Sequence, residues 1–262
     1  MARGDEEGSD YLVPGFKIVE AAGERSRVLL KAIHPDIQGH LAGRHLARHP
    51  AEARAAVEAQ GGAKAFMKKH RAMATLLPAR GLNTVFFGDL ATVDLSRLDL
   101  GGAIGAAIGR ALQVNTTLWR ISLRDNKLGP EGGAALARAL EHNTVLRQLS
   151  LRNNALGASG GAAIANALAA NTTLLQLDLG NNGLGERGGA AIGRTLGGGA
   201  ALQQLYLGFN DLGVEAGVAI ADALAEDTAL QQLNLWHCNL SADVEARIRR
   251  ACEGKPGFKL TT

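Results

Sequence analysis

The sequence is poor in the features that mark several large classes of protein. Aromatic residues make up 4% of its 262 residues, and there are two cysteines. No apolar run reaches the length of about 18 residues that a membrane-spanning helix needs. The acidic start of the chain, residues 1–7, has no apolar signal segment. We therefore expect an intracellular protein, in the cytoplasm, with reduced cysteines.

The chain also lacks the short motifs of common catalytic sites. The glycine-rich stretch at residues 101–105 has no lysine and so does not match a phosphate-binding loop. His40, His45 and His49 lie among arginines, which is more typical of a solvated basic face than of a metal site. We expect no enzymatic activity, no cofactor and no metal.

A repeat of 28 residues is present instead. The pattern Leu-x-x-Leu-x-Leu-x-x-Asn-x-Leu-Gly starts at Leu118, and five copies stay in phase. The later copies start at Leu146, Leu174, Leu202 and Leu230. In the last copy Cys238 stands at the asparagine position, so we expect it to be buried rather than to act as a nucleophile beside His237. Leu-x-Leu alternation predicts a short strand with both leucines on one face.

Apolar pairs four residues apart, such as Leu136 and Leu140, predict one helix in each repeat. Paired small residues, such as Gly132 and Gly133, come before them and predict close packing between neighbouring helices. An asparagine follows several of the helices and is predicted to end each with left-handed backbone; these are Asn115, Asn143 and Asn171. Because one unit cannot bury its own apolar face, the units are expected to stack.

This pattern resembles the leucine-rich repeats, and its even spacing resembles the ribonuclease-inhibitor-like branch. The resemblance implies an α/β solenoid, a horseshoe with an inner parallel sheet and outer helices. We expect about six repeats and a C-terminal cap over residues 89–262, with a diverged first repeat that has Leu98 at the asparagine position. Phe258 and Leu260 predict a closing strand. The resemblance also implies a non-enzymatic scaffold that binds another protein.

The N-terminal part reads differently. Residues 1–14 are expected to form a flexible acidic tail, and residues 15–88 a small basic domain. Four helices are predicted, at residues 19–32, 37–48, 51–60 and 63–73. Residues 74–77 and 84–87 then predict a β-hairpin. This order, and the run at residues 46–70, resembles small winged-helix domains of the LOTUS kind. The alternative is a helical cap that shields the first repeat.

Candidate binding residues lie at the second, fourth, sixth and seventh positions after the leading leucine, which face the hollow of the predicted solenoid. Aromatic side chains gather in the last repeats: Tyr206, Phe209, Trp236 and His237. Arginines gather in the first: Arg120, Arg124 and Arg152. Tyrosine, tryptophan and arginine are enriched in binding hot spots, so we predict a protein-binding site centred on the rings. Alternatively, the segment around Phe258 covers the rings.

A second hypothesis is RNA binding by the N-terminal domain. Residues 25–80 carry 11 basic and 3 acidic side chains. The residues predicted to contact phosphates are Arg44, Arg48, Arg54, Lys64, Lys68, Lys69 and Arg71, with Arg80 on the wing. A third possibility is a structural subunit of a larger complex that uses both ends of the chain.

Overall fold

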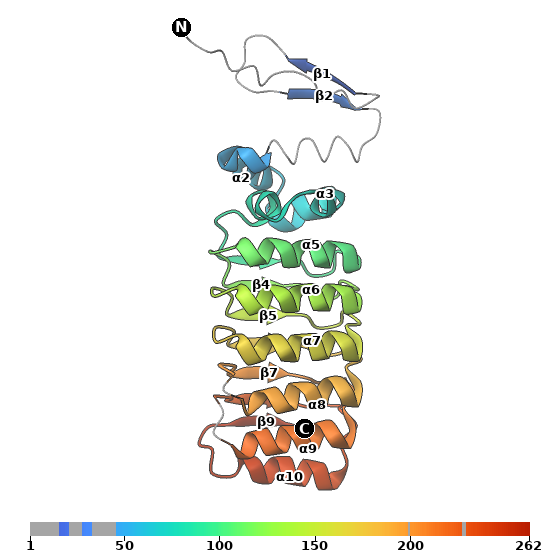
Figure 1. Cartoon of the computed structure of the whole chain (residues 1–262), viewed down its shortest axis with the longest axis vertical. Helices are drawn as coiled ribbons and strands as arrows, with labels where there is room; N and C mark the ends of the chain where they lie inside the picture. Colours follow the sequence, from blue (N-terminus) through green and yellow to red (C-terminus); the bar gives the residue numbers. More distant parts are fainter. Residues whose placement is uncertain (1–15, 21–27, 33–45, 199, 227–228) are drawn as a thin grey trace.

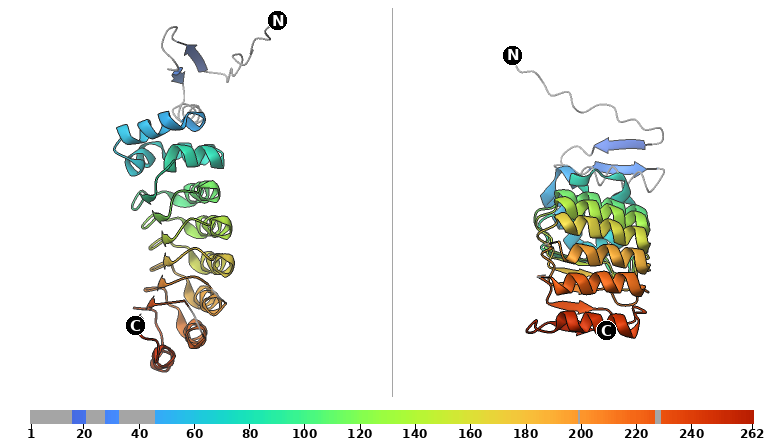
Figure 2. Two further views of the ribbon diagram at one scale, coloured as in Figure 1. Left: turned by 90° about the vertical axis from the view of Figure 1, so that its left-hand side faces the viewer. Right: turned by 60° about the horizontal axis from the view of Figure 1, so that its bottom comes forward.

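The computed structural model describes residues 16–20, 28–32, 46–198, 200–226 and 229–262. Strand–helix units stack along one axis, with their helices side by side (Figure 1). Strands line one side of the stack and helices the other, and the stack curves toward the strand side (Figure 2). The α/β solenoid predicted from the repeat is confirmed.

The strands form one seven-stranded parallel sheet in chain order. They are β3 Thr92–Asp94, β4 Arg120–Ser122, β5 Gln148–Ser150, β6 Gln176–Asp178, β7 Gln204–Tyr206, β8 Gln232–Asn234 and β9 Lys259–Thr261. Equivalent positions pair across neighbouring strands, so that Leu149 lies opposite Leu177. The predicted closing strand is β9, in which Leu260 lies opposite Leu233.

A helix follows each strand from β3 to β8, as parallel pairing requires a crossover. These helices are α5 Gly101–Val114, α6 Gly129–His142, α7 Gly157–Ala170, α8 Gly185–Leu196, α9 Gly213–Ala225 and α10 Ala242–Cys252. The predicted apolar pairs are buried: Leu136 is 1% exposed and Leu140 2%. With the strand leucines they form one continuous apolar core along the stack.

Close contact between helices explains the recurrent glycines. A methyl group on Gly133 would lie 3.2 Å from Cδ2 of Leu156 and 3.3 Å from Cα of Gly160. One on Gly189 would lie 2.7 Å from Cβ of Ala216. Because even an alanine would crowd the next helix at these positions, the absence of a side chain sets the spacing of the stack.

Buried asparagines tie each loop to its neighbour. In Asn154, Nδ2 donates to the carbonyl oxygens of Leu123 and Leu151, each at 2.9 Å, and Oδ1 accepts from the amide of Asn126 at 3.1 Å. Asn126, Asn182 and Asn210 repeat this arrangement. Cys238 ends the series, where its thiol donates to the carbonyl of Leu207 at 3.3 Å. The ladder therefore satisfies backbone groups that water cannot reach.

The asparagines after the helices act in another way than predicted. Asn115 and Asn143 have φ of −81° and −80°, so the expected left-handed backbone is wrong. In Asn143, Nδ2 donates to the carbonyl of Leu112 at 2.7 Å, and Oδ1 accepts from the amide of Leu146 at 2.7 Å. Asparagine is present there for these hydrogen bonds, not for its backbone freedom.

The predicted winged helix is also wrong. Helices α2 Pro50–Ala59 and α3 Ala63–Leu76 confirm two of the predicted helices. In place of the hairpin, the chain forms the short helix α4 Ala79–Leu82 and the π-helix η1 Asn83–Phe87. Phe86 and Phe87 are each 2% exposed. Adjacent residues of a strand point to opposite faces, whereas a helical turn lets both rings reach the same core.

The helix predicted over residues 19–32 is wrong as well. Strand β1 Phe16–Glu20 pairs antiparallel with β2 Val28–Ala32. Short apolar runs such as residues 28–30 are compatible with either a strand or a helix. Residues 46–48 are helical, but the rest of the helix predicted at 37–48, and the tail at 1–14, lie outside the described residues.

The N-terminal helices share a core with the first repeat. Phe66, Met67 and Phe86 belong to the same buried cluster as Leu95 and Ile108. The apolar face of β3 and α5 is therefore covered where the stack begins. In the part of the chain that the structure describes, no helix is both long and apolar enough to cross a membrane.

Candidate functional site

The loops that follow the strands hold an unusual backbone at the seventh position after the leading leucine. The φ angle is positive there in every repeat: 60° at Arg97, 58° at Asp125, 57° at Asn153, 51° at Asn181, 63° at Phe209 and 53° at His237. Asparagine, aspartate and histidine are the residues most often found in this conformation, whereas for a phenylalanine it costs about 1–2 kcal/mol. Phe209 therefore occupies a position that the fold fills more easily with asparagine.

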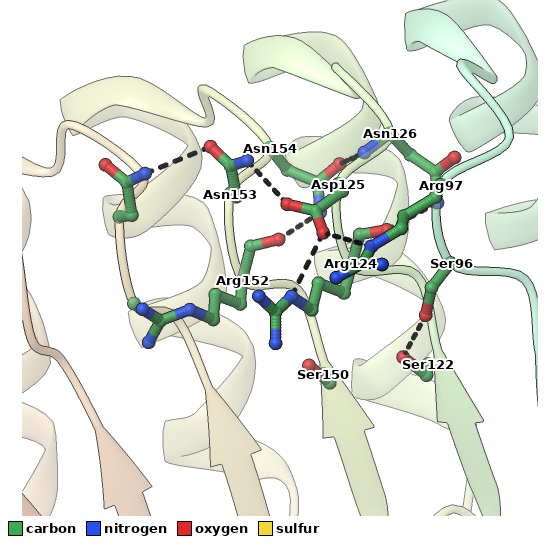
Figure 3. A network of polar contacts seen from close by, with 12 residues as sticks. Ser96, Arg97, Ser122, Arg124, Asp125, Asn126, Ser150, Arg152, Asn153 and Asn154 are labelled. Carbon is green, nitrogen blue, oxygen red and sulfur yellow. Dashed lines mark hydrogen bonds and ion pairs between the residues drawn. The ribbon is translucent and has the colours of Figure 1, made fainter.

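In the first repeats these loops carry a polar network centred on Asp125 (Figure 3). Oδ2 of Asp125 accepts from Nε of Arg97 at 3.2 Å and from Nε of Arg124 at 3.0 Å. Oδ1 accepts from Nδ2 of Asn153 at 2.5 Å, and Oδ1 of Asn153 accepts from Asn181 at 3.1 Å. The hydrogen bond from Asn153, then the two arginines, hold the pKa of Asp125 below its usual value.

In the last repeats aromatic side chains stand at the sixth or the seventh position after the leading leucine. Phe209, Trp236 and His237 form what we name the aromatic cluster. The ring centroids of Phe209 and Trp236 lie 5.0 Å apart, edge to face, and those of Phe209 and His237 lie 5.0 Å apart, stacked. Trp236 and His237 lie 4.2 Å apart. The two separations that involve Phe209 lie within the range of about 4.5–7 Å that aromatic pairs prefer.

The aromatic cluster is open to solvent. Phe209 is 40% exposed and Trp236 49%. Phe258 packs against the main core instead, next to β9. The alternative that the C-terminal segment covers the rings is therefore not what the structure shows.

Tyr206, the fourth predicted ring, lies apart from the cluster. It is half-buried on β7, and its hydroxyl donates to Oε1 of Gln204 at 3.2 Å. Among the described residues it has no ring contact with the aromatic cluster. Its position opposite Asp178 and Asn234 places it on the same sheet face, beside the cluster.

Arg152 joins the polar and aromatic parts. Its guanidinium carbon lies 5.6 Å from the ring centroid of Phe209, within the range of a cation–π contact. A methyl group on Gly180 would lie 2.9 Å from Nη1 of Arg152, so the glycine leaves room for this side chain to cross the intervening strand. Arg120 lies exposed on β4, further from the rings.

Sequence reasoning missed two features of this surface. Trp119, directly before β4, is 39% exposed. Trp119 stands one position after the leading Leu118, which is outside the four positions considered in each repeat. Because the sequence has only two tryptophans, the residue type itself is a signal that could have pointed to this position. Gly180 and Gly208 stand where Arg124, Arg152 and Trp236 occur in other repeats. Their role becomes visible only from the distance that an added side chain would have to its neighbours.

Three of the basic residues predicted to contact phosphates have partners within the chain. Lys64 pairs with Asp94, and Nη1 of Arg71 donates to the carbonyl of Leu98, so both bind the first repeat. Arg54 pairs with Glu58 and Asp89. Arg48, Lys68, Lys69 and Arg80 are exposed. Arg80 lies on α4 rather than on a wing, and Arg44 lies outside the described residues.

The thiols have an inert environment. Burial raises the pKa of Cys238 to about 11, so it stays protonated at neutral pH. Cys252 is half-buried, and both cysteines are free.

Across the described residues, no group of three or more histidine, cysteine, aspartate or glutamate side chains could hold a metal ion.

A family model described as Leucine Rich repeat matches residues 114–137, 142–165 and 170–193. These ranges fall on the repeats whose strands, helices and asparagine ladder are described above. These residues therefore consist of leucine-rich repeats. The model does not name a branch of the family, so the ribonuclease-inhibitor-like assignment stays a prediction.

Comparison with solved structures finds partial similarities, of which two are described here. The structure titled "Leiomodin-1 Actin-Binding Site 2 (ABS2)" is 24% identical, over 62% of this chain and 79% of that one, with a TM-score of 0.45. The tropomodulin C-terminal domain from Caenorhabditis elegans is 15% identical, over 63% of this chain and 83% of that one, with a TM-score of 0.43. No curated protein matches the chain.

Proposed function

We propose that this leucine-rich repeat protein is a non-enzymatic scaffold that binds a protein partner through the strand side of the stack. The centre of the binding surface is the aromatic cluster, with Tyr206 beside it. Arg120, Arg124 and Arg152 form its outer region. Because fold alone does not establish function, the proposal rests on this surface and not on the repeat architecture.

One observation carries the proposal. Phe209 is exposed and has φ of 63°, where earlier repeats have Asn153 and Asn181. The fold therefore does not require a ring at this position. Strained residues that the fold does not need cluster at binding sites, and aromatic side chains are enriched in protein interfaces.

We assign the N-terminal helices the role of a cap. Phe66 and Phe86 cover the apolar end of the first repeat, which a bare solenoid would expose to water. Lys64 and Arg71 fasten the same helices to the repeat through Asp94 and Leu98. Basic side chains that are occupied in this way are less suited to bind phosphates.

The test removes the rings while keeping the fold. The full-length chain and its Phe209→Asn, Trp236→Ala double variant are used to capture partners from native extract, with quantification by mass spectrometry. Val214→Asn is the matched control, since Val214 is 54% exposed and lies at the start of α9. We expect that at least one protein binds to the wild type and to the Val214→Asn control but does not bind to the double variant. Equal capture by all three proteins would refute the proposal.

A further inference from the structure

We propose that the partner presents an acidic segment with an apolar anchor, which lies in extended form across the strands from the aromatic cluster to Arg120. This inference rests on the proposed function of the same surface, because it specifies the chemistry of what binds there. The argument uses the charges on the strand side, the exposure of the rings and the spacing of the strands.

The carboxylates on the strand side already have partners within the chain. Asp94 accepts from Ser96 and pairs with Lys64. Asp178 accepts from the amide of Gly180 at 3.0 Å and from the hydroxyl of Ser150 at 3.3 Å. Asp125 is held by Arg97, Arg124 and Asn153, as described above. A cationic ligand would have to displace these contacts.

Three cations on the same face have no carboxylate partner among the described residues: Arg120, Arg152 and Lys259. Arg120 begins β4 and Lys259 begins β9, so both stand in the row of positions that faces away from the core. Arg152 contacts the ring of Phe209 but no acid. The charge left for a partner on this face is therefore positive, and it complements carboxylates.

The rings supply the apolar half of the site. The guanidinium of Arg152 contacts the ring of Phe209. Trp236 packs edge to face with the same ring, and His237 stacks on it. Arg152 contacts the aromatic cluster directly. When an apolar side chain of the partner packs on the rings, the residues next to it in the partner segment therefore lie close to the guanidinium of Arg152. The geometry favours an acidic residue adjacent to the apolar anchor.

Strand spacing sets the length of the segment. Trp236 follows β8 and Arg120 begins β4, so four inter-strand steps separate their strands. At about 4.8 Å a step, this is roughly 19 Å measured across the sheet, so an extended peptide needs at least about six residues to cover it. A segment of about that length can place an apolar anchor at one end and a carboxylate at Arg120 at the other.

The test uses a phage-displayed library of random twelve-residue peptides, selected on the immobilised full-length chain. Peptides that also bind the Phe209→Asn, Trp236→Ala variant are discarded, and the rest are synthesised with a fluorophore for anisotropy titration. We expect enrichment of aspartate and glutamate beside an aromatic or aliphatic residue, and binding that weakens with salt. The double variant Arg120→Gln, Arg152→Gln should weaken binding on the order of tenfold.

The matched control is the double variant Arg110→Gln, Arg138→Gln, which removes two exposed arginines from α5 and α6 on the helix side. It should leave binding unchanged. Cluster-dependent peptides of neutral or basic composition would overturn the acidic-segment inference but leave the proposed function in place. A selection that returns no cluster-dependent peptide would count against both.

Discussion

The guanidinium of Arg152 lies over the ring of Phe209, with its central carbon 5.6 Å from the ring centroid, although the two residues belong to different repeats. The contact joins the polar network of the first repeats to the aromatic cluster of the last ones. It exists because Gly180, in the repeat between them, has no side chain to block the path of Arg152.

The strained backbone at Phe209 predicts an asymmetry between two substitutions. Phe209→Asn should change the free energy of unfolding by less than about 1 kcal/mol, since relief of strain offsets the lost ring contacts. Phe209→Val should be less stable than Phe209→Asn by about 1–2 kcal/mol, because a β-branched residue is unsuited to positive φ. Urea unfolding followed by circular dichroism compares the two, and equal midpoints would contradict the prediction.

The asparagine ladder predicts a large cost for one buried amide. Asn154→Ala removes the donor to Leu123 and Leu151 and leaves the amides of Asn126 and Leu128 without their acceptor. Unsatisfied buried groups cost about 1–3 kcal/mol each, so the two amides together should lower the free energy of unfolding by about 2–6 kcal/mol.

The control for this variant is Asn181→Gly, which removes an exposed side chain in the next loop and suits the φ of 51° there. It should cost less than about 1 kcal/mol, since water replaces the single hydrogen bond of Asn181 to Asn153. Similar losses from both substitutions would mean that the ladder does not hold the repeats together.

The two cysteines should differ in reactivity. Burial raises the pKa of Cys238 to about 11, and its side chain is 2% exposed, whereas Cys252 is half-buried. In the native protein at pH 8, iodoacetamide should modify Cys252 well before Cys238, as measured by mass spectrometry of the peptides. Denaturation should remove the difference.

The raised pKa of Cys238 also affects stability. Because the folded state favours the neutral thiol, the stabilising effect is present below the pKa of the unfolded thiol and is lost as the pH rises toward 11.

The carboxyl of Asp125 should titrate below its ordinary value, because Asn153, Arg97 and Arg124 all stabilise its charged form. Its contribution to stability is therefore present above the unfolded pKa of about 3.9 and is lost as the pH falls through the lower folded value. Carbon-detected NMR titration should show the pKa of Asp125 rising in Asn153→Ala, which removes the largest cause, and rising less in Asn181→Ala. No rise in Asn153→Ala would show that the hydrogen bond does not set this pKa.

Part of the fold and of the candidate site could be read from the sequence. Leu149 and Leu177 are opposite each other in the sheet because equivalent positions of a repeat must stack in register. The same periodicity brings Phe209 and His237 together, since each follows its leading leucine by seven positions. The N-terminal part has no such repeat, and there the run of Thr84 to Phe87 predicts a strand, whereas the structure has a helix.

A period of 28 residues, leucines that alternate on a strand and an asparagine at one fixed position of the repeat are enough to predict the stack, because stacking is the one way to bury the apolar face. Which side chains are free to bind becomes clear only from the packing in three dimensions. Burial of Phe86, the backbone strain of Phe209 and the path of Arg152 over Gly180 depend on neighbours one or more repeats away. The physical reason is that periodicity specifies the face on which a residue lies, whereas its exposure and partners depend on the volumes and charges packed around it.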